Sequence, residues 1–158
     1  MRRLLCIILT LALTLPCLAL AEETPLTMNA PGETVRPGRA VMLSFTMQSG
    51  GYLFNGQDAG PLMAQLEDWG AAAVGFNCVA ADEMTPGLVS KLRRFTRLPL
   101  ICKPNAGVPT IGDDGIAVYS QTPQEFAEVM KQCKENGATL LGGCCGTAPE
   151  YIAALRGI

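Results

Sequence analysis

Three cysteines in this sequence occupy positions from which their thiols could act together. Cys78 ends the run Gly75-Phe76-Asn77-Cys78, and Cys144 and Cys145 are adjacent, with glycines on both sides. Adjacent cysteines rarely bond to each other without strain, because a disulfide requires separated Cα atoms and facing side chains. The flanking glycines instead allow the backbone to turn both sulfurs toward one point. The pattern therefore favours a shared ligand over a Cys144–Cys145 disulfide.

Three thiolates with one open coordination position are typical of a catalytic zinc site, because a structural site uses four protein ligands. Zinc would keep a substrate thiol deprotonated at the open position, as it keeps its cysteine ligands. A free thiol has a pKa of about 8.5 and is mostly protonated at neutral pH, so metal binding would make it a nucleophile for a methyl group. The sequence contains no histidine, which excludes Ser-His catalysis, Cys-His catalysis and any histidine metal site.

The cysteines need a fold that brings together positions 66 residues apart. Short apolar runs predict buried parallel strands over residues 40–45, 73–77, 98–102 and 138–142. Amphipathic stretches predict helices from Asp58 to Gly70, over 85–95, from 122 to about 136, and from 147 to the C-terminus. Residues 104–121 are predicted to form a long loop rich in Gly, Pro and Asp.

Particular residues support these helices. Leu62, Leu66 and Trp69 are predicted to point inward from the first helix, and Leu88 and Leu92 from the second. Capping boxes are predicted at the starts of the last two helices, over residues 122–125 and 147–150.

The order βαβαβαβα implies a parallel sheet with right-handed crossovers. Four βα units are half of an eightfold barrel, which needs roughly 250 residues. We therefore predict an α/β fold over residues 40–158, a parallel (βα)₄ half of a TIM-type (β/α)₈ barrel. Because active residues in parallel α/β folds gather at the carboxyl ends of strands, Cys78 and the Cys144–Cys145 pair are expected at one edge of the sheet.

A signal-peptide-like segment precedes this fold. Arg2 and Arg3 are followed by an apolar run that Pro16 interrupts, and the segment ends in Ala19-Leu20-Ala21. We expect cleavage after Ala21, a linker over residues 22–39, and export to the periplasm or the medium. An uncleaved leader would instead be a membrane anchor, although the apolar run is short for a span of roughly 20 residues.

The composition limits the partners. The chain has 14 acidic and 12 basic residues, a balance that argues against nucleic acid, which requires clustered positive charge. The nearest basic group is Lys91, Arg93, Arg94 and Arg97, and its spacing indicates the solvated side of one helix. Two further cysteines, Cys102 and Cys133, are interpreted as small core residues.

Three runs along the chain resemble the homocysteine S-methyltransferase family: residues 75–78, 103–107 (Lys-Pro-Asn-Ala-Gly) and 142–147 (Gly-Gly-Cys-Cys-Gly-Thr). The resemblance spans residues 40–158 and implies a zinc-dependent barrel that methylates homocysteine to methionine. It implies Zn²⁺ ligation by Cys78, Cys144 and Cys145. It also implies that Asn77 lies beside the metal and that further polar residues line the same mouth, namely Ser44, Thr46 and Asn105. From the residues alone, these four could equally do no more than terminate strands.

The resemblance also predicts the partners, which are homocysteine and a small methyl donor that the sequence does not identify. The matching residues correspond to the last four βα units of the family's barrel. A lone half-barrel leaves two unpaired sheet edges and an open apolar face, so a second copy or another chain is expected to complete it. The alternative is a non-catalytic truncated family member that binds zinc or a thiol ligand. The family is normally cytoplasmic, which conflicts with the predicted export.

Overall fold

The structure is a computed structural model, and it describes residues 39–158. The predicted signal peptide over residues 1–21 and all but the last residue of the predicted linker lie outside the described residues. Within the described part of the chain, none of the helices combines the length and the apolar character needed to cross a membrane.

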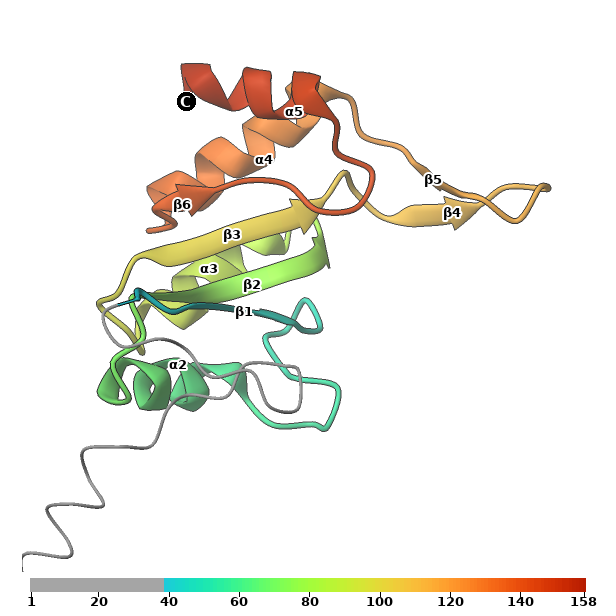
Figure 1. Cartoon of the computed structure of the whole chain (residues 1–158). Coiled ribbons are helices and arrows are strands. Elements are labelled where there is room, and N and C mark those ends of the chain that lie inside the picture. The colour runs from blue at the N-terminus through green and yellow to red at the C-terminus, as the bar shows by residue number, and fades with distance from the viewer. Residues whose placement is uncertain (1–38) are drawn as a thin grey trace, which may run out of the picture. The chain divides into compact units, whose positions relative to one another are not determined.

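The centre of the fold is a parallel sheet of four strands in the order β1-β2-β3-β6. Its strands are β1 (Met42–Thr46), β2 (Ala73–Ala80), β3 (Leu100–Asn105) and β6 (Leu140–Leu141). The helices that follow them are α2 (Ala59–Asp68), α3 (Thr85–Arg93), α4 (Pro123–Glu135) and α5 (Pro149–Ala154), with a final 3₁₀ turn, Leu155–Gly157 (Figure 1). The predicted order βαβαβαβα and the parallel sheet are confirmed.

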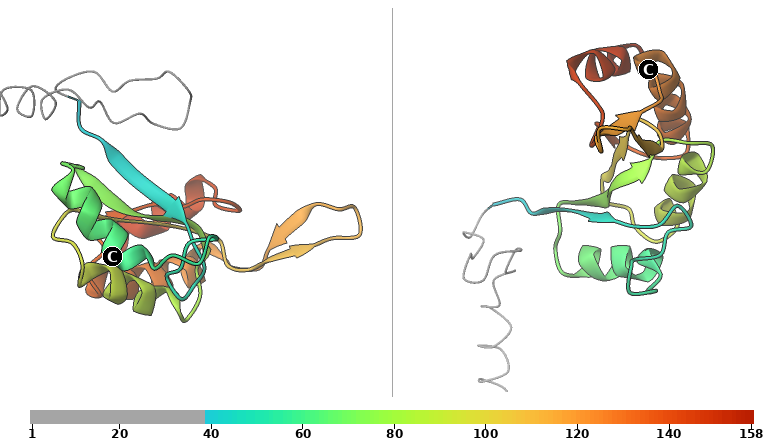
Figure 2. Two further views of the ribbon diagram at one scale, coloured as in Figure 1. Left: turned by 90° about the horizontal axis from the view of Figure 1, so that it is seen from below. Right: turned by 90° about the vertical axis from the view of Figure 1, so that its right-hand side faces the viewer.

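The sheet curves, and the helices lie on its outer side (Figure 2). In a parallel sheet, residues paired across strands point to the same face. One set of rows, Leu43–Val74–Leu100 and Phe45–Phe76–Cys102–Leu141, packs toward the helices. The alternate rows, Ser44–Gly75–Ile101–Leu140 and Thr46–Asn77–Lys103, therefore lie on the inner face. The hydrophobic core thus lies between the outer face of the sheet and the helices.

At two of the three helix starts marked by a polar residue in the sequence, Asp58 and Thr122 but not Thr147, the expected side-chain cap is confirmed. Asp58 caps α2 by accepting a hydrogen bond from the Gly60 N–H, and Thr122 and Glu125 form the reciprocal capping box of α4. The capping box predicted at 147–150 is wrong, because α5 starts from Ala148 without a side-chain cap. The hydroxyl of Thr147 instead donates a 2.7 Å hydrogen bond to the Cys144 carbonyl, three residues back along the chain.

The predicted inward position of Trp69 is also wrong. Helix α2 ends at Asp68, so Trp69 is the cap residue and is 57% exposed. Met63, at 0% exposed, fills the core on that helix. Leu88 and Leu92 are buried as predicted, and so are Cys102 and Cys133, both at 0% exposed.

The loop predicted over residues 104–121 contains an antiparallel hairpin of β4 (Pro109–Ile111) and β5 (Ala117–Tyr119). Figure 1 shows it projecting from the body of the fold as a two-stranded arm. Its strands have only three residues each. Such short strands show no clear alternation of apolar and polar residues in the sequence, and a turn rich in Gly and Asp separates them. The prediction of a loop throughout residues 104–121 is therefore wrong.

The basic residues near α3 are not uniformly solvated. The guanidinium group of Arg93 is partly buried and donates to the carbonyls of Thr96 and Leu98. Lys91 forms a 3.0 Å ion pair with Asp58, while Arg94 and Arg97 are exposed. Arg93 therefore holds the connection between α3 and β3 and is not part of a solvated surface.

Candidate metal centre

The sulfurs of Cys78, Cys144 and Cys145 converge at the carboxyl edge of the sheet. The Cys78–Cys144 distance is 2.7 Å, and the Cys78–Cys145 and Cys144–Cys145 distances are both 3.9 Å. Cys78 and Cys144 are half-buried and Cys145 is exposed, so the cluster opens to solvent on one side. Within residues 39–158, it is the one group of three or more Cys, Asp or Glu side chains close enough to share a metal ion.

Cys78 reaches the cluster through an unusual backbone conformation. Its φ of 57° makes it the one non-glycine residue with positive φ among the described residues. The register between β2 and β3 shifts between Asn77 and Ala80, which marks a bulge. In a regular strand, Cys78 would point to the face opposite Asn77, toward the helices. The bulge instead turns its sulfur toward Cys144, at a backbone cost on the order of 1–3 kcal/mol.

The loop that carries Cys144 and Cys145 is tied to the end of β3. The Cys144 N–H donates to the Pro104 carbonyl, and the Ala106 N–H donates to the Cys145 carbonyl, at 2.8 and 3.0 Å. The Cys145 N–H donates to Oδ1 of Asn105 at 3.1 Å. Asn105 is buried, so it holds one cysteine in place through its amide oxygen.

The predicted site residues take different places around the cluster. Asn77 and Thr46 lie side by side on the inner face, where the Asn77 Nδ2 group donates a 3.4 Å hydrogen bond to Thr46 Oγ1. Both are close enough to Cys78 to lower its pKa. Ser44 lies on the same face two residues earlier in β1. The structure therefore brings Asn77, Thr46 and Asn105 to the cysteines and leaves Ser44 one row farther away.

The environment separates the acidities of the thiols. The hydrogen bond from Cys144 is the main cause that lowers the pKa of Cys78, and those from Asn77, Cys145 and Thr46 add to it. Burial, followed by the hydrogen bonds with Cys78 and Cys145, raises the pKa of Cys144 to about 11. In the metal-free protein, Cys78 is therefore the more acidic of the two thiols, and Cys144 retains its proton at neutral pH.

Tyr119 is a neighbour of the cluster that sequence reasoning missed. Its ring packs against Gly146, which has a φ of 76° and no room for a side chain. Burial raises the pKa of Tyr119, and the nearby Cys145 thiol raises it further. The run Ala117-Val118-Tyr119 is typical of a strand and was the one available signal for this contact.

The cysteine geometry fits zinc. A Zn–S distance of 2.3 Å gives a sulfur–sulfur distance of about 3.8 Å in a tetrahedral site, and two of the three distances are 3.9 Å. The third, 2.7 Å between Cys78 and Cys144, would have to lengthen by about 1 Å to match this tetrahedral spacing. Three soft sulfur donors suit zinc. Among the described residues, no fourth Cys, Asp or Glu joins the cluster, so a zinc ion held by these three cysteines alone would keep one coordination position for another molecule.

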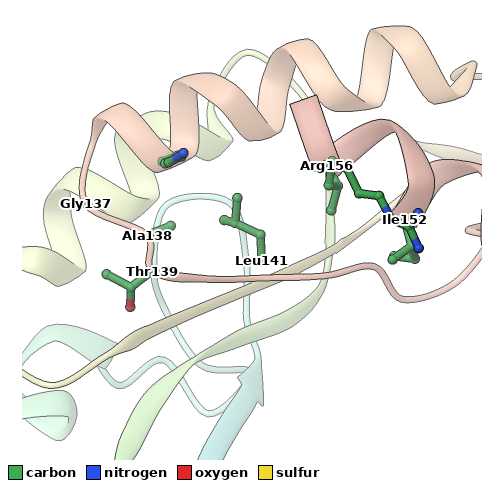
Figure 3. Close-up of a pocket in the computed structure, with 8 residues that line it drawn as sticks. Gly137, Ala138, Thr139, Leu141, Ile152 and Arg156 are labelled. Carbon is green, nitrogen blue, oxygen red and sulfur yellow. The ribbon is translucent and has the colours of Figure 1, made fainter. Parts of the chain in front are cut away.

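A pocket of about 650 Å³ lies elsewhere, beside the end of α4, β6 and α5 (Figure 3). Ala138, Thr139 and Leu141 line it on one side, and Ile152 and Arg156 on the other. None of the three cysteines borders this pocket. It is therefore separate from the cysteine cluster.

The fold and the cysteine cluster define a class of protein, an α/β protein with three converging cysteine thiols at the carboxyl edge of a parallel sheet. The family model for homocysteine S-methyltransferase matches residues 7–158. The chain belongs to the homocysteine S-methyltransferase family.

Individual relatives agree with this assignment. The chain is 31% identical to the homocysteine S-methyltransferase of Escherichia coli over 128 residues, which are 78% of this chain and 40% of that enzyme. It is 34% identical to the methionine synthase of Mycobacterium leprae over 113 residues, which are 71% of this chain and 9% of that protein. The chain thus spans less than half the length of these relatives.

Solved structures give the same result. The metallated form of the homocysteine methyltransferase MmuM from E. coli is 31% identical, with a TM-score of 0.59 over 77% of this chain and 36% of that one. The oxidized form of MmuM gives a TM-score of 0.60. The parallel sheet and its helices are therefore consistent with part of the TIM-barrel-like fold of these methyltransferases.

Proposed function

We propose that this chain carries the metal-binding part of a homocysteine S-methyltransferase site. In this site, Cys78, Cys144 and Cys145 would hold Zn²⁺, and homocysteine would be methylated to methionine. The observation that carries the proposal is the convergence of the three sulfurs, whose ligand atoms all lie within 4.8 Å of one another. Membership of the family supports homocysteine as the substrate.

Zinc bound to three thiolates would lower the pKa of a substrate thiol and so supply a nucleophile at neutral pH. In this reaction, the homocysteine sulfur would lose its proton to solvent and form a bond to the methyl carbon. The bond between that carbon and the donor breaks, and its electron pair leaves with the donor.

The chain's own residues have distinct tasks in this scheme. The bulge at Cys78 and the β3 contacts of the Cys144–Cys145 loop place the sulfurs before any ligand arrives, which limits the reorganisation needed on binding. Asn77 and Thr46 stabilise the charged form of Cys78. The exposure of Cys145 leaves a side of the cluster by which a thiol can enter.

The first test is the zinc content of the full chain purified under reducing conditions, compared with Cys78→Ser. Cys133→Ala is the matched control, because this cysteine is buried in the core and lies outside the cluster. We expect one zinc per chain in the wild type and in the control, and none in Cys78→Ser. Zinc retained by Cys78→Ser would contradict the assigned ligand set.

The second test is the formation of methionine from homocysteine by the zinc-loaded chain, with S-methylmethionine and betaine among the methyl donors. We expect turnover with at least one donor and none with Cys78→Ser. A folded, zinc-loaded chain that is inactive with every donor would refute the proposed reaction for this chain, while the zinc site itself would stand.

A further inference from the structure

Lys103 is the single charged residue on the strands that the structure describes. A charged residue within a parallel strand is unusual, because such strands are normally buried on both faces. Its neighbours along β3, Cys102 and Pro104, are buried, whereas Lys103 is exposed. The lysine therefore occupies a place where an apolar residue would be expected.

The side chain of Lys103 belongs to the inner face of the sheet. Lys103 is in register with Asn77, which in turn pairs with Thr46. The hydrogen bond between the Asn77 and Thr46 side chains places both on this face, and side chains paired in a parallel sheet share a face. Lys103 thus completes a polar row, Thr46–Asn77–Lys103, next to the residues that carry the cysteines.

One contact of its own and its place on β3 put Lys103 next to the segment that leads to the cysteine loop. A Cβ atom on Gly142 would lie 3.2 Å from Cγ and 3.5 Å from Cδ of Lys103, so the lysine stem runs along the segment that leads to Cys144. Two residues farther along the same face of β3, Asn105 holds the Cys145 N–H. The stem of Lys103 therefore lies close to the mouth of the metal centre, on its sheet side.

The charge of Lys103 has no partner among the described residues. The one ion pair recorded within residues 39–158 joins Lys91 to Asp58, and none of the described strands carries a carboxylate. A cation on the face of the sheet that leads to the cysteine cluster, without a protein anion, provides a binding group for an anionic part of a ligand. Homocysteine has such a part, because its α-carboxylate lies at the other end of a short carbon chain from its sulfur.

We propose that Lys103 binds the α-carboxylate of the thiol substrate and so selects an amino-acid thiol over simple thiols. The proposal rests on the proposed function, in which the substrate sulfur enters the cysteine cluster. Lys103 contributes a point charge on a flexible stem, which suits a carboxylate whose position depends on the sulfur being anchored first. It acts as a specificity-determining residue, while Cys78, Cys144 and Cys145 hold the sulfur end.

The test compares three thiols by calorimetric binding to the zinc-loaded full chain. These are homocysteine, mercaptobutyrate (homocysteine without its amino group) and aminopropanethiol (homocysteine without its carboxylate). For Lys103→Met, we expect about tenfold weaker binding of the first two and unchanged binding of aminopropanethiol. Lys103→Arg should restore most of the loss. Lys131→Met, which removes an exposed lysine from α4, should leave all three affinities unchanged.

Cobalt substitution provides a readout that does not depend on substrate. Thiolate-to-cobalt absorption should be the same in Lys103→Met and in the wild type, because the lysine is not a ligand. If Lys103→Met weakens all three thiols equally or weakens none, the role assigned to Lys103 is overturned while thiol binding stands. If the wild type binds no thiol at all, both the proposed function and this inference are overturned.

Discussion

Replacement of Asn105 by alanine would test whether the tertiary position of the cysteine loop controls metal binding. Asn105 is 8% exposed, and its Oδ1 atom accepts a 3.1 Å hydrogen bond from the Cys145 N–H. Alanine removes the acceptor and leaves this N–H group in a partly buried place without a partner. The loop that carries two of the three sulfurs then loses its one side-chain tie to β3.

The expected loss of zinc affinity depends on the hydrogen bonds that still hold the cysteine loop. Loss of one hydrogen bond costs about 1 kcal/mol, and an unsatisfied buried partner can raise this to about 3 kcal/mol. Two backbone hydrogen bonds, from Cys144 to Pro104 and from Ala106 to Cys145, still hold the loop in Asn105→Ala. We therefore expect a loss near the lower value, which corresponds to roughly fivefold weaker zinc binding.

The assay is competition for zinc between the full chain and a chromophoric chelator under reducing conditions, with urea unfolding measured in parallel. Asn136→Ala is the matched control, because this exposed asparagine caps α4 and lies away from the cysteines. Its zinc affinity should equal that of the wild type. Zinc affinity in Asn105→Ala equal to that of the wild type would refute the reasoning, since the backbone bonds alone would then suffice to place Cys145.

Three further outcomes are expected. Gly146→Ala should lower the thermal midpoint and weaken zinc binding, because residue 146 has a φ of 76° and packs against an aromatic ring. Gly56→Ala is the control, because residue 56 has a φ of 84° and open space around it. It should show only the smaller effect of the backbone conformation. Met63→Ala should lower the free energy of unfolding in urea by about 2–5 kcal/mol, because this side chain is fully buried. In the metal-free protein, iodoacetamide should alkylate Cys78 at lower pH than Cys144, as mass spectrometry of the modified peptides would record, because the pKa of Cys78 is lowered and that of Cys144 is raised to about 11. Since the folded state holds the Cys144 proton more tightly than the unfolded chain does, the stability from this group is complete below about pH 8.5 and is lost as the pH rises toward 11.

Each of these expectations has a contradicting result. Equal losses in Gly146→Ala and Gly56→Ala would mean that the aromatic contact at residue 146 contributes nothing. A loss below about 0.5 kcal/mol in Met63→Ala would be that of a surface residue and would contradict its place in the core. Alkylation of Cys144 before Cys78 would contradict the assigned order of acidity.

Several features of the fold were open to prediction because they depend on residues close together in the chain. The capping box at Thr122 is complete within four residues, and the apolar runs at 73–77 and 98–102 suffice to indicate buried strands. Since parallel strands place their carboxyl ends at one edge, the meeting of Cys78 with Cys144 could be predicted across 66 positions. The second capping box failed because the Thr147 hydroxyl had a competing partner in the Cys144 carbonyl.

Local signals alone thus determine the alternation of strands and helices, the position of the core and the three cysteines as candidate ligands. Other features depend on contacts between segments distant in the chain. The left-handed conformation at Cys78 arises from the bulge against β3. The contact of Tyr119 with the cysteine loop arises from a hairpin whose strands are too short to be recognised in the sequence. The inward direction of Lys103 depends on its register with Asn77. A one-residue change of register would move every side chain on that strand to the opposite face. The side chains that reach the site are therefore decided by the pairing between strands, which no single segment of the sequence determines.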